Sequence, residues 1–232
     1  MSNFAEKKKM SIRENLEKIK KELPGQVKLV AVSKTKPAEM IMEAYEAGHR
    51  IFGENKAQEL AAKHEVLPKD IEWHFIGHLQ TNKVKYIAPF VSLIHSVDSL
   101  KVLKEINKQA VKNDRVIDCL LQFHIAKEST KFGLNFEEAE ALIKALAEFR
   151  NVRFTGVMGM ATYTDDTDKI HREFRQLHTY FDRLKEKYFA ADPAFKEISM
   201  GMSGDYKIAV EEGSTIVRLG TVIFGARDYG NK

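Results

Sequence analysis

A lysine closes the first apolar segment of this chain, at a position where an amine has no ordinary structural use. Residues 28–33 read KLVAVS, which predicts a buried strand, and Lys34 follows them directly. Lysine is seldom buried unless it is paired or chemically employed. Burial lowers the pKa of an amine and leaves it neutral and nucleophilic, as a Schiff-base lysine requires. The competing interpretation is that the strand has ended and Lys34 points into water.

Two later segments carry groups suited to binding an anion. Ser199, Gly201 and Ser203 place two hydroxyls around a glycine, where main chain can approach a ligand closely. The helix expected to follow would add N–H groups and a positive dipole end. Gly220 and Thr221 repeat the pattern after the next apolar run. Either loop alone is explained as a turn with a helix N-cap, but two such loops at neighbouring positions predict phosphate binding.

An arginine lies inside the last apolar run. Arg218 stands within residues 216–219 (IVRL), and a buried guanidinium stays charged and needs an acceptor. It could pair with a carboxylate such as Glu54, or face a ring nitrogen or a phosphate of a ligand. A strand-end lysine, two phosphate-binding loops and an inward arginine together describe a pyridoxal phosphate site.

The elements that must position these residues alternate between two kinds. Apolar, β-branched runs predict eight strands, at residues 27–33, 49–53, 72–76, 93–97, 116–124, 153–158, 197–200 and 215–224. Charged, helix-periodic stretches separate them, at residues 37–47, 56–65, 82–87, 99–112, 136–149, 169–188 and 205–212. A further amphipathic helix precedes the first strand, within about residues 5–23 and clearest at 11–23.

This alternation predicts an α/β fold with a parallel sheet, and eight units in about 200 residues suit a closed (β/α)8 TIM barrel with an extra N-terminal helix. We expect a single domain over residues 1–232. An open doubly wound sheet is the runner-up, weakened because no G-x-G-x-x-G turn follows the first strand. In a barrel the chemistry sits where strands end, which is where Lys34, Asn55 and Arg218 fall.

Composition restricts the class of protein. The chain has 232 residues, of which 44% are hydrophobic and 30% charged, as in ordinary soluble proteins. Its net charge of +4 comes from scattered lysines, so we expect no nucleic-acid partner. One cysteine, Cys119, excludes a disulfide within the chain. No secretory signal or membrane-length apolar stretch is visible, so we expect a cytoplasmic protein with no membrane association. His74 and His78 alone do not predict a metal site.

Five ordered motifs strengthen the interpretation. They are residues 31–37 (AVSKTKP), 52–55 (FGEN), 73–83 (WHFIGHLQTNK), 199–203 (SMGMS) and 217–227 (VRLGTVIFGAR). Together they resemble the pyridoxal phosphate homeostasis protein family, also called YggS-like or proline-synthase-co-transcribed proteins, which resembles the N-terminal barrel domain of alanine racemase. The resemblance spans nearly the whole chain.

The resemblance implies where the cofactor, pyridoxal 5'-phosphate, would bind. Lys34 would hold it as an aldimine, Asn55 would lie near it, and Arg218 would face the pyridine nitrogen. Phosphate contacts would come from Ser199, Gly201, Ser203, Gly220 and Thr221. At position 78 this chain has His78 where the family pattern has proline, so we assign that residue no function.

A cofactor site need not make an enzyme. A permanently charged arginine disfavours protonation of the ring nitrogen, and an unprotonated pyridine is a poorer electron sink. Racemisation needs two bases on opposite faces of the substrate carbon. The racemase takes the opposing one from a second domain that we do not expect in this chain. We therefore expect a carrier or buffer of the cofactor and no enzymatic role, with a weakly active amino-acid racemase as the alternative.

The partners expected of such a carrier are the cofactor, PLP-dependent apo-enzymes and free amino acids, with the protein a monomer or weak dimer. Lys36 and Lys131 are candidate amines for accepting the cofactor, although a solvated surface lysine is the better explanation of each. A cofactor-free Schiff-base aldolase or an RNA-interaction protein would remain if no cofactor bound.

Overall fold

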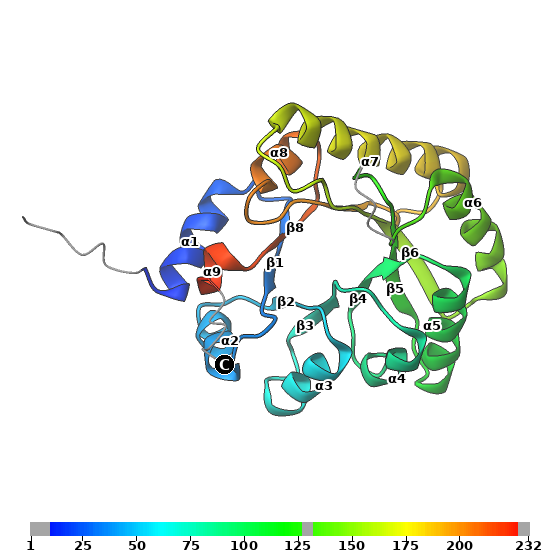
Figure 1. Ribbon diagram of the computed structural model, residues 1–232. Helices are drawn as coiled ribbons and strands as arrows, with labels where there is room; N and C mark the ends of the chain where they lie inside the picture. Colours follow the sequence, from blue (N-terminus) through cyan, green and yellow to red (C-terminus); the bar gives the residue numbers. More distant parts are fainter. Residues whose placement is uncertain (1–9, 127–131, 227–232) are drawn as a thin grey trace, which may run out of the picture.

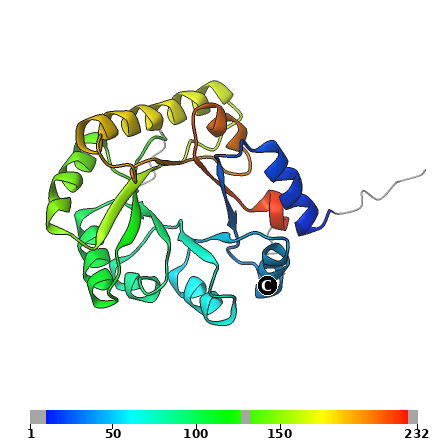
Figure 2. The ribbon, with the colours of Figure 1, turned by 180° about the vertical axis from the view of Figure 1, so that it is seen from behind.

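A computed structural model describes residues 10–126 and 132–226 of the chain. In this part, eight parallel strands close into a barrel in the order β1 to β8, with β8 pairing back onto β1. Figure 1 shows the strands ringed by helices, and Figure 2 shows the same ring from behind. The strands are β1 (Lys28–Val32), β2 (Ile51–Glu54), β3 (Glu72–Phe75), β4 (Leu93–Val97), β5 (Ile117–Gln122), β6 (Val152–Met158), β7 (Glu197–Ser199) and β8 (Ile216–Leu219). The predicted TIM barrel is confirmed.

Helices follow the strands as the alternation predicts. They are α1 (Ile12–Glu22), α2 (Ala38–Glu46), α3 (Ala57–Val66), α4 (Val84–Ile87), α5 (Leu100–Lys112), α6 (Phe136–Ala145), α7 (Thr167–Tyr188), α8 (Tyr206–Glu211) and α9 (Thr221–Phe224). Two 3-10 turns, η1 (Thr81–Lys83) and η2 (Leu146–Glu148), adjoin α4 and α6. No described helix has the length and apolar character needed to cross a bilayer.

Two apolar clusters account for the continuous hydrophobic strands. The larger one fills the space between the strands and the surrounding helices. The smaller joins side chains from five strands: Val30, Leu93, Leu120, Met158 and Ile216. Strands that are apolar on both faces are expected where helices cover the outside and side chains fill the barrel.

The first helix begins later than about residue 5. Ser11 caps α1 reciprocally with Glu14, whose main-chain N–H donates to the Ser11 hydroxyl at 3.2 Å and whose carboxylate accepts from the Ser11 N–H at 2.7 Å. The cap places the start of the helix at Ile12; residues 5–9 of the expected helix lie outside the described residues.

The prediction of a strand through residue 224 is wrong at its end. β8 ends at Leu219, Gly220 leaves the extended conformation, and α9 forms a single turn beside α1 (Figure 1). The Asn15 side-chain amide of α1 donates to the carbonyl of Ile223 at 3.0 Å. Only one side of this turn is buried, and a short apolar run cannot by itself distinguish a strand from a docked helical turn.

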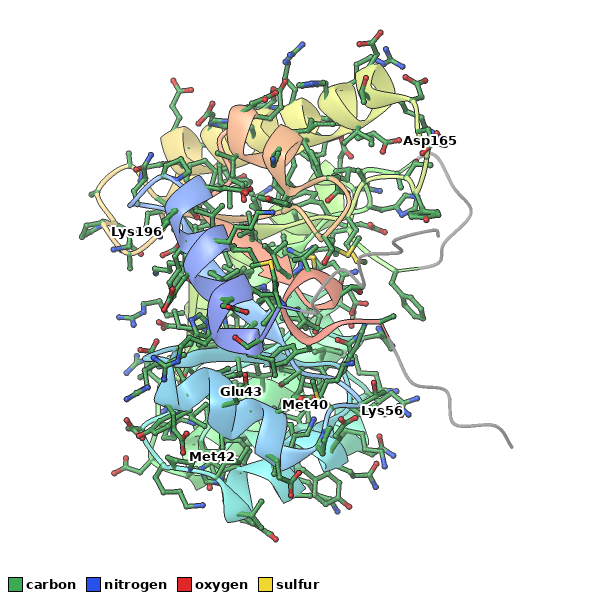
Figure 3. The ribbon with its side chains drawn as sticks, turned by 90° about the vertical axis from the view of Figure 1, so that its left-hand side faces the viewer. Met40, Met42, Glu43, Lys56, Asp165 and Lys196 are labelled. Atoms are coloured by element: carbon green, nitrogen blue, oxygen red, sulfur yellow. The ribbon has the colours of Figure 1, made fainter. Side chains whose placement is uncertain are left out.

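The two ends of the barrel are clearly separated. In Figure 3, Lys56 and Asp165, which follow β2 and β6, lie on one side, and Lys196, which precedes β7, lies on the other. The strand-end residues proposed for chemistry therefore share one end of the barrel.

Candidate functional site

Lys34 lies in a tight turn at the carboxyl end of β1. The N–H of Lys36 donates to the carbonyl of Ser33 at 3.0 Å, which closes the turn around Lys34. Thr35 has a φ of 63°, a left-handed conformation that a threonine adopts only where surrounding contacts enforce it. The Lys34 side chain is partly buried. The turn therefore gives this lysine a defined starting position.

The contacts that enforce the turn come from a buried charged cluster. Lys63, on α3, donates to the Ser33 carbonyl at 2.8 Å and to the Glu54 carboxylate at 2.7 Å. The Ser33 hydroxyl donates to the same Glu54 oxygen at 2.6 Å. Glu59 accepts from the N–H of Thr35 and from Lys63, each at 2.7 Å. Main-chain groups on both sides of Lys34 are thus held by charged partners.

Glu54 is the most deeply placed member of this cluster. Its side chain is fully buried, and one of its two carboxylate oxygens has no hydrogen-bond partner among the described residues. Burial raises the pKa of the Glu54 carboxyl, and the charge of Lys63 opposes that effect. Glu54 pairs with Lys63, so the ion pair considered for Arg218 and Glu54 is wrong.

Lys36 connects the same turn to the end of the described chain. Its amine donates to three carbonyls at the end of α9, those of Phe224, Gly225 and Ala226, at 3.3, 3.2 and 2.9 Å. A cation at a helix C-terminus satisfies carbonyls that have no partner in the helix. The side chain considered as a possible acceptor of the cofactor therefore joins two loops of the site. Lys131, the other candidate, lies outside the described residues.

The two loops predicted to hold a phosphate are adjacent. The Arg218 N–H donates to the Gly201 carbonyl at 2.9 Å, and the Gly220 N–H donates to the Ser203 hydroxyl at 3.4 Å. Gly201 has a φ of 96°, and a Cβ there would lie 2.6 Å from the Cβ of Ala209. Thr221, the first residue of α9, is exposed. The loops bring hydroxyls and close main chain together, as an anion site requires.

Arg218 points into the barrel and is 4% exposed. Its Nη1 donates to the Ser199 hydroxyl at 2.6 Å and its Nη2 to the Gly159 carbonyl at 3.1 Å. Among the described residues it makes no salt bridge with a carboxylate within 4 Å. Burial lowers the pKa of Arg218 to about 10, with the charge of Asp205 opposing, so the guanidinium remains cationic at neutral pH. Ser199 is fully buried and its hydroxyl contacts Arg218.

Asn55 has a buried side-chain oxygen to which a bound ligand could donate a hydrogen bond. Its side-chain oxygen is buried and has no hydrogen-bond partner among the described residues. Gly77 packs against the main chain of Asn55 so closely that a Cβ at Gly77 would lie 2.3 Å from the Asn55 main-chain carbonyl oxygen. An orphaned buried acceptor costs free energy unless something donates to it. The donor set and this orphaned atom fit a polar, anionic cofactor.

Strand order explains why these residues meet. β1 lies between β2 and β8, and β8 pairs with β7. Val32 is in register with Gly53, so Lys34 and Asn55, each two residues further on, stand at the same level. Arg218 is in register with Val30. Four consecutive strands of the closed barrel therefore carry Lys34, Asn55, Ser199 and Arg218.

Sequence reasoning missed two groups at the site. Lys63 follows Ala57 and Leu60 at helical spacing on the buried side of α3, and a lysine on an apolar helix face is a signal that could have been noticed. His95 stands within the wholly buried strand β4 and bonds to His74 and Ser199. His78 lies apart from them, near Asp98 at 3.2 Å.

Known proteins match the chain over most of its length. The family described as alanine racemase, N-terminal domain, matches residues 9–228. The pyridoxal phosphate homeostasis protein of Aquifex aeolicus is 44% identical over 203 residues, covering 87% of this chain and 88% of that protein. The protein of that name from Escherichia coli strain K12 is 38% identical over 213 residues, covering 90% and 89%.

Solved structures of other proteins share the fold of this chain. PipY of Synechococcus elongatus PCC7942, solved with PLP bound, superposes with a TM-score of 0.84 at 35% identity, covering 93% of this chain and all of that one. An alanine racemase from Bartonella henselae, at 16% identity and a TM-score of 0.70, shares the fold over 60% of its own length and 92% of this chain.

Proposed function

The chain belongs to the pyridoxal phosphate homeostasis protein family, and from that premise we propose that it binds pyridoxal 5'-phosphate and serves as an intracellular carrier or buffer of it. The observation that carries the proposal is the convergence of Lys34, Arg218 and the two glycine loops on neighbouring strands at one end of the barrel. A PLP-bound relative with the same fold supports it.

Different residues of the site would contact different parts of the cofactor. Lys34, in the turn that Lys63 and Glu59 hold, would bind the cofactor aldehyde through its amine. Ser203, Gly201, Gly220 and Thr221 would contact the phosphate with hydroxyls and main chain. The side chain of Asn55 accepts a hydrogen bond that no described residue supplies.

Arg218 sets the limits of the chemistry. A guanidinium can only donate, so it stabilises an acceptor and opposes protonation of a ring nitrogen beside it. Bound pyridoxal phosphate supplies an aldehyde for reversible linkage to amines and, when its ring is protonated, an electron sink. Because Arg218 opposes protonation of the ring, the bound cofactor would be a poor electron sink. This protein therefore favours holding the cofactor, and releasing it to apo-enzymes or free amino acids, over carbanion chemistry.

A spectroscopic titration tests the proposal. We expect added pyridoxal phosphate to produce a visible absorption band that borohydride bleaches, with the cofactor then fixed to Lys34 in the peptide map. Lys34→Ala should abolish the band, while Lys56→Ala, an exposed lysine after β2 at the same end of the barrel (Figure 3), should leave it unchanged. A protein that takes up no cofactor would refute the proposal.

Racemisation is the second candidate, since the alanine racemase N-terminal domain family matches the chain. A chiral assay of the loaded protein with D- and L-amino acids separates the two. Turnover at enzyme-like rates would favour the racemase; exchange of the cofactor onto added amines without racemisation would favour the carrier.

A further inference from the structure

A chain of hydrogen bonds runs through the barrel interior from Arg218. The Arg218 Nη1 donates to the Ser199 hydroxyl at 2.6 Å, and that hydroxyl lies 2.9 Å from Nδ1 of His95. Nε2 of His95 lies 3.0 Å from Nδ1 of His74. Ser199 and His95 are fully buried and His74 is 5% exposed. This series of hydrogen bonds therefore joins side chains of β8, β7, β4 and β3 within the barrel interior.

The donors and acceptors available to these side chains determine which atom donates in each hydrogen bond. Arg218 can only donate, so the Ser199 oxygen accepts and its own hydrogen is available for His95 Nδ1. A neutral His95 that accepts at Nδ1 carries its proton at Nε2 and donates it to His74 Nδ1. His74 in turn carries its proton at Nε2. Every polar hydrogen between Arg218 and His74 then has an acceptor.

The opposite direction leaves a group unsatisfied. With the His95 proton at Nδ1, the Ser199 oxygen would accept from both neighbours, and its own hydrogen would have no acceptor among the hydrogen bonds of the described residues. A charged His95 is opposed by burial and by Arg218 itself. Burial lowers the pKa of His95 well below its usual value and that of His74 to about 3. Both rings are therefore neutral at physiological pH.

We propose that His95 and His74 are positioning residues that orient the guanidinium of Arg218 toward the cofactor ring by directing the Ser199 hydroxyl. The Gly159 carbonyl holds the other arm of the guanidinium. With one arm fixed on each side, the plane of the guanidinium is set before any ligand arrives. This role rests on the proposed function, because it presupposes a ring acceptor beside Arg218.

The strand order places His95, though not Ser199 on β7, away from the proposed phosphate loops. His95 is on β4, across the barrel from the loops that contain Ser203 and Gly220. A change at His95 should thus alter the environment of the ring and leave the phosphate loops in place. The series of hydrogen bonds ends at His74, which lines a polar cavity together with Lys28 and Glu197. Lys28 and Glu197 form an ion pair at 2.6 Å.

The first arm of the test needs no cofactor. Nitrogen-15 spectra of histidine-labelled, cofactor-free protein report which ring nitrogen carries the proton. We expect His95 and His74 both to be neutral and protonated at Nε2. A His95 protonated at Nδ1 would reverse the chain and overturn the proposal, whatever the protein binds.

The second arm uses variants and the absorption of bound pyridoxal phosphate. His95→Phe and Ser199→Ala should each weaken cofactor binding about tenfold and move the absorption maximum, as expected for a misaligned charge-assisted hydrogen bond. Ser199→Thr keeps a hydroxyl and should restore both properties. Ser96→Ala is the matched control, since the Ser96 hydroxyl is buried beside His95 on β4 and has no partner among the described residues.

The outcomes are distinguishable. If His95→Phe binds the cofactor with unchanged affinity and absorption maximum, the positioning role is refuted while the carrier function stands. If wild-type protein takes up no cofactor, the proposed function fails and the positioning role fails with it. In that case the histidine spectra still report the direction of the hydrogen-bond chain. If His95→Phe does not fold, the contrast between Ser199→Ala and Ser199→Thr decides the question.

Discussion

The amine of Lys63 lies 2.8 Å from the main-chain carbonyl of Ser33 and donates a hydrogen bond to it, one residue before Lys34. This contact links a helix on the outside of the barrel to the turn that contains Lys34, the lysine proposed to hold the cofactor. The same amine neutralises Glu54, which is fully buried. The position of Lys34 therefore depends on a charged cluster beneath it.

Replacing Lys63 by methionine should destabilise the protein by about 3 kcal/mol, because removing one partner leaves a buried carboxylate uncompensated. Denaturant unfolding measures the free energy. We also expect weaker cofactor uptake, since the Ser33 carbonyl loses its donor. Lys104→Met, at an exposed position on α5, is the control and should change neither quantity. Equal stability of the two variants would contradict this account of the cluster.

Gly201→Ala and Gly204→Ala form a matched pair in the loop after β7. At Gly201 a side chain meets both a left-handed backbone and a Cβ contact of 2.6 Å, whereas at Gly204 nothing lies within 4 Å of an added Cβ. The first substitution should cost about 2 kcal/mol and weaken cofactor binding. The second should do neither. Titration calorimetry and thermal melts of both variants check the contrast.

Lys36→Met should loosen α9 and leave Lys34, the proposed cofactor lysine, able to react. Three carbonyls lose their common donor, which should cost about 1 kcal/mol. Lys36→Arg keeps a cation there and should recover most of the loss. Borohydride should still fix the cofactor to Lys34 in both variants. Fixation that moves to, or requires, position 36 would show that Lys36 is the reactive amine.

Stability should fall as the pH is lowered from about 6.5 toward 4. Burial lowers the pKa of His49 to about 4 and that of His74 to about 3, both below the usual 6.5. In this window the unfolded chain binds more protons than the folded one, so unfolding becomes easier as pH falls. His49→Gln keeps an N–H donor for the Ile51 carbonyl, which His49 contacts at 2.8 Å, but does not titrate.

The measurement is the free energy of unfolding of wild type and His49→Gln between pH 7.5 and about 4. Wild type should lose stability more steeply, and the two curves should converge in slope above the usual histidine pKa. Parallel curves throughout would show that His49 does not remain neutral in the folded state.

Local periodicity was enough to predict the barrel and the order of its strands. Alternating strand and helix patterns identified all eight strands because each element buries a face within its own stretch of chain. Lys34 and Asn55 at the ends of apolar runs, and Arg218 within one, were recognisable as candidates because polar and charged side chains are seldom buried without a partner. The error at residues 221–224 has the same origin, since a run of four apolar residues contains too little periodicity to separate a strand from a helical turn.

The sequence by itself therefore determined the fold class and identified the candidate site residues, through patterns carried by neighbouring positions. Only the tertiary structure decided their partners. Closure of the barrel brings β8 beside β1, and it places Lys63 under the turn of Lys34 and His95 against Ser199. Such contacts join residues far apart along the chain, and they depend on which strands become neighbours and which way each side chain faces.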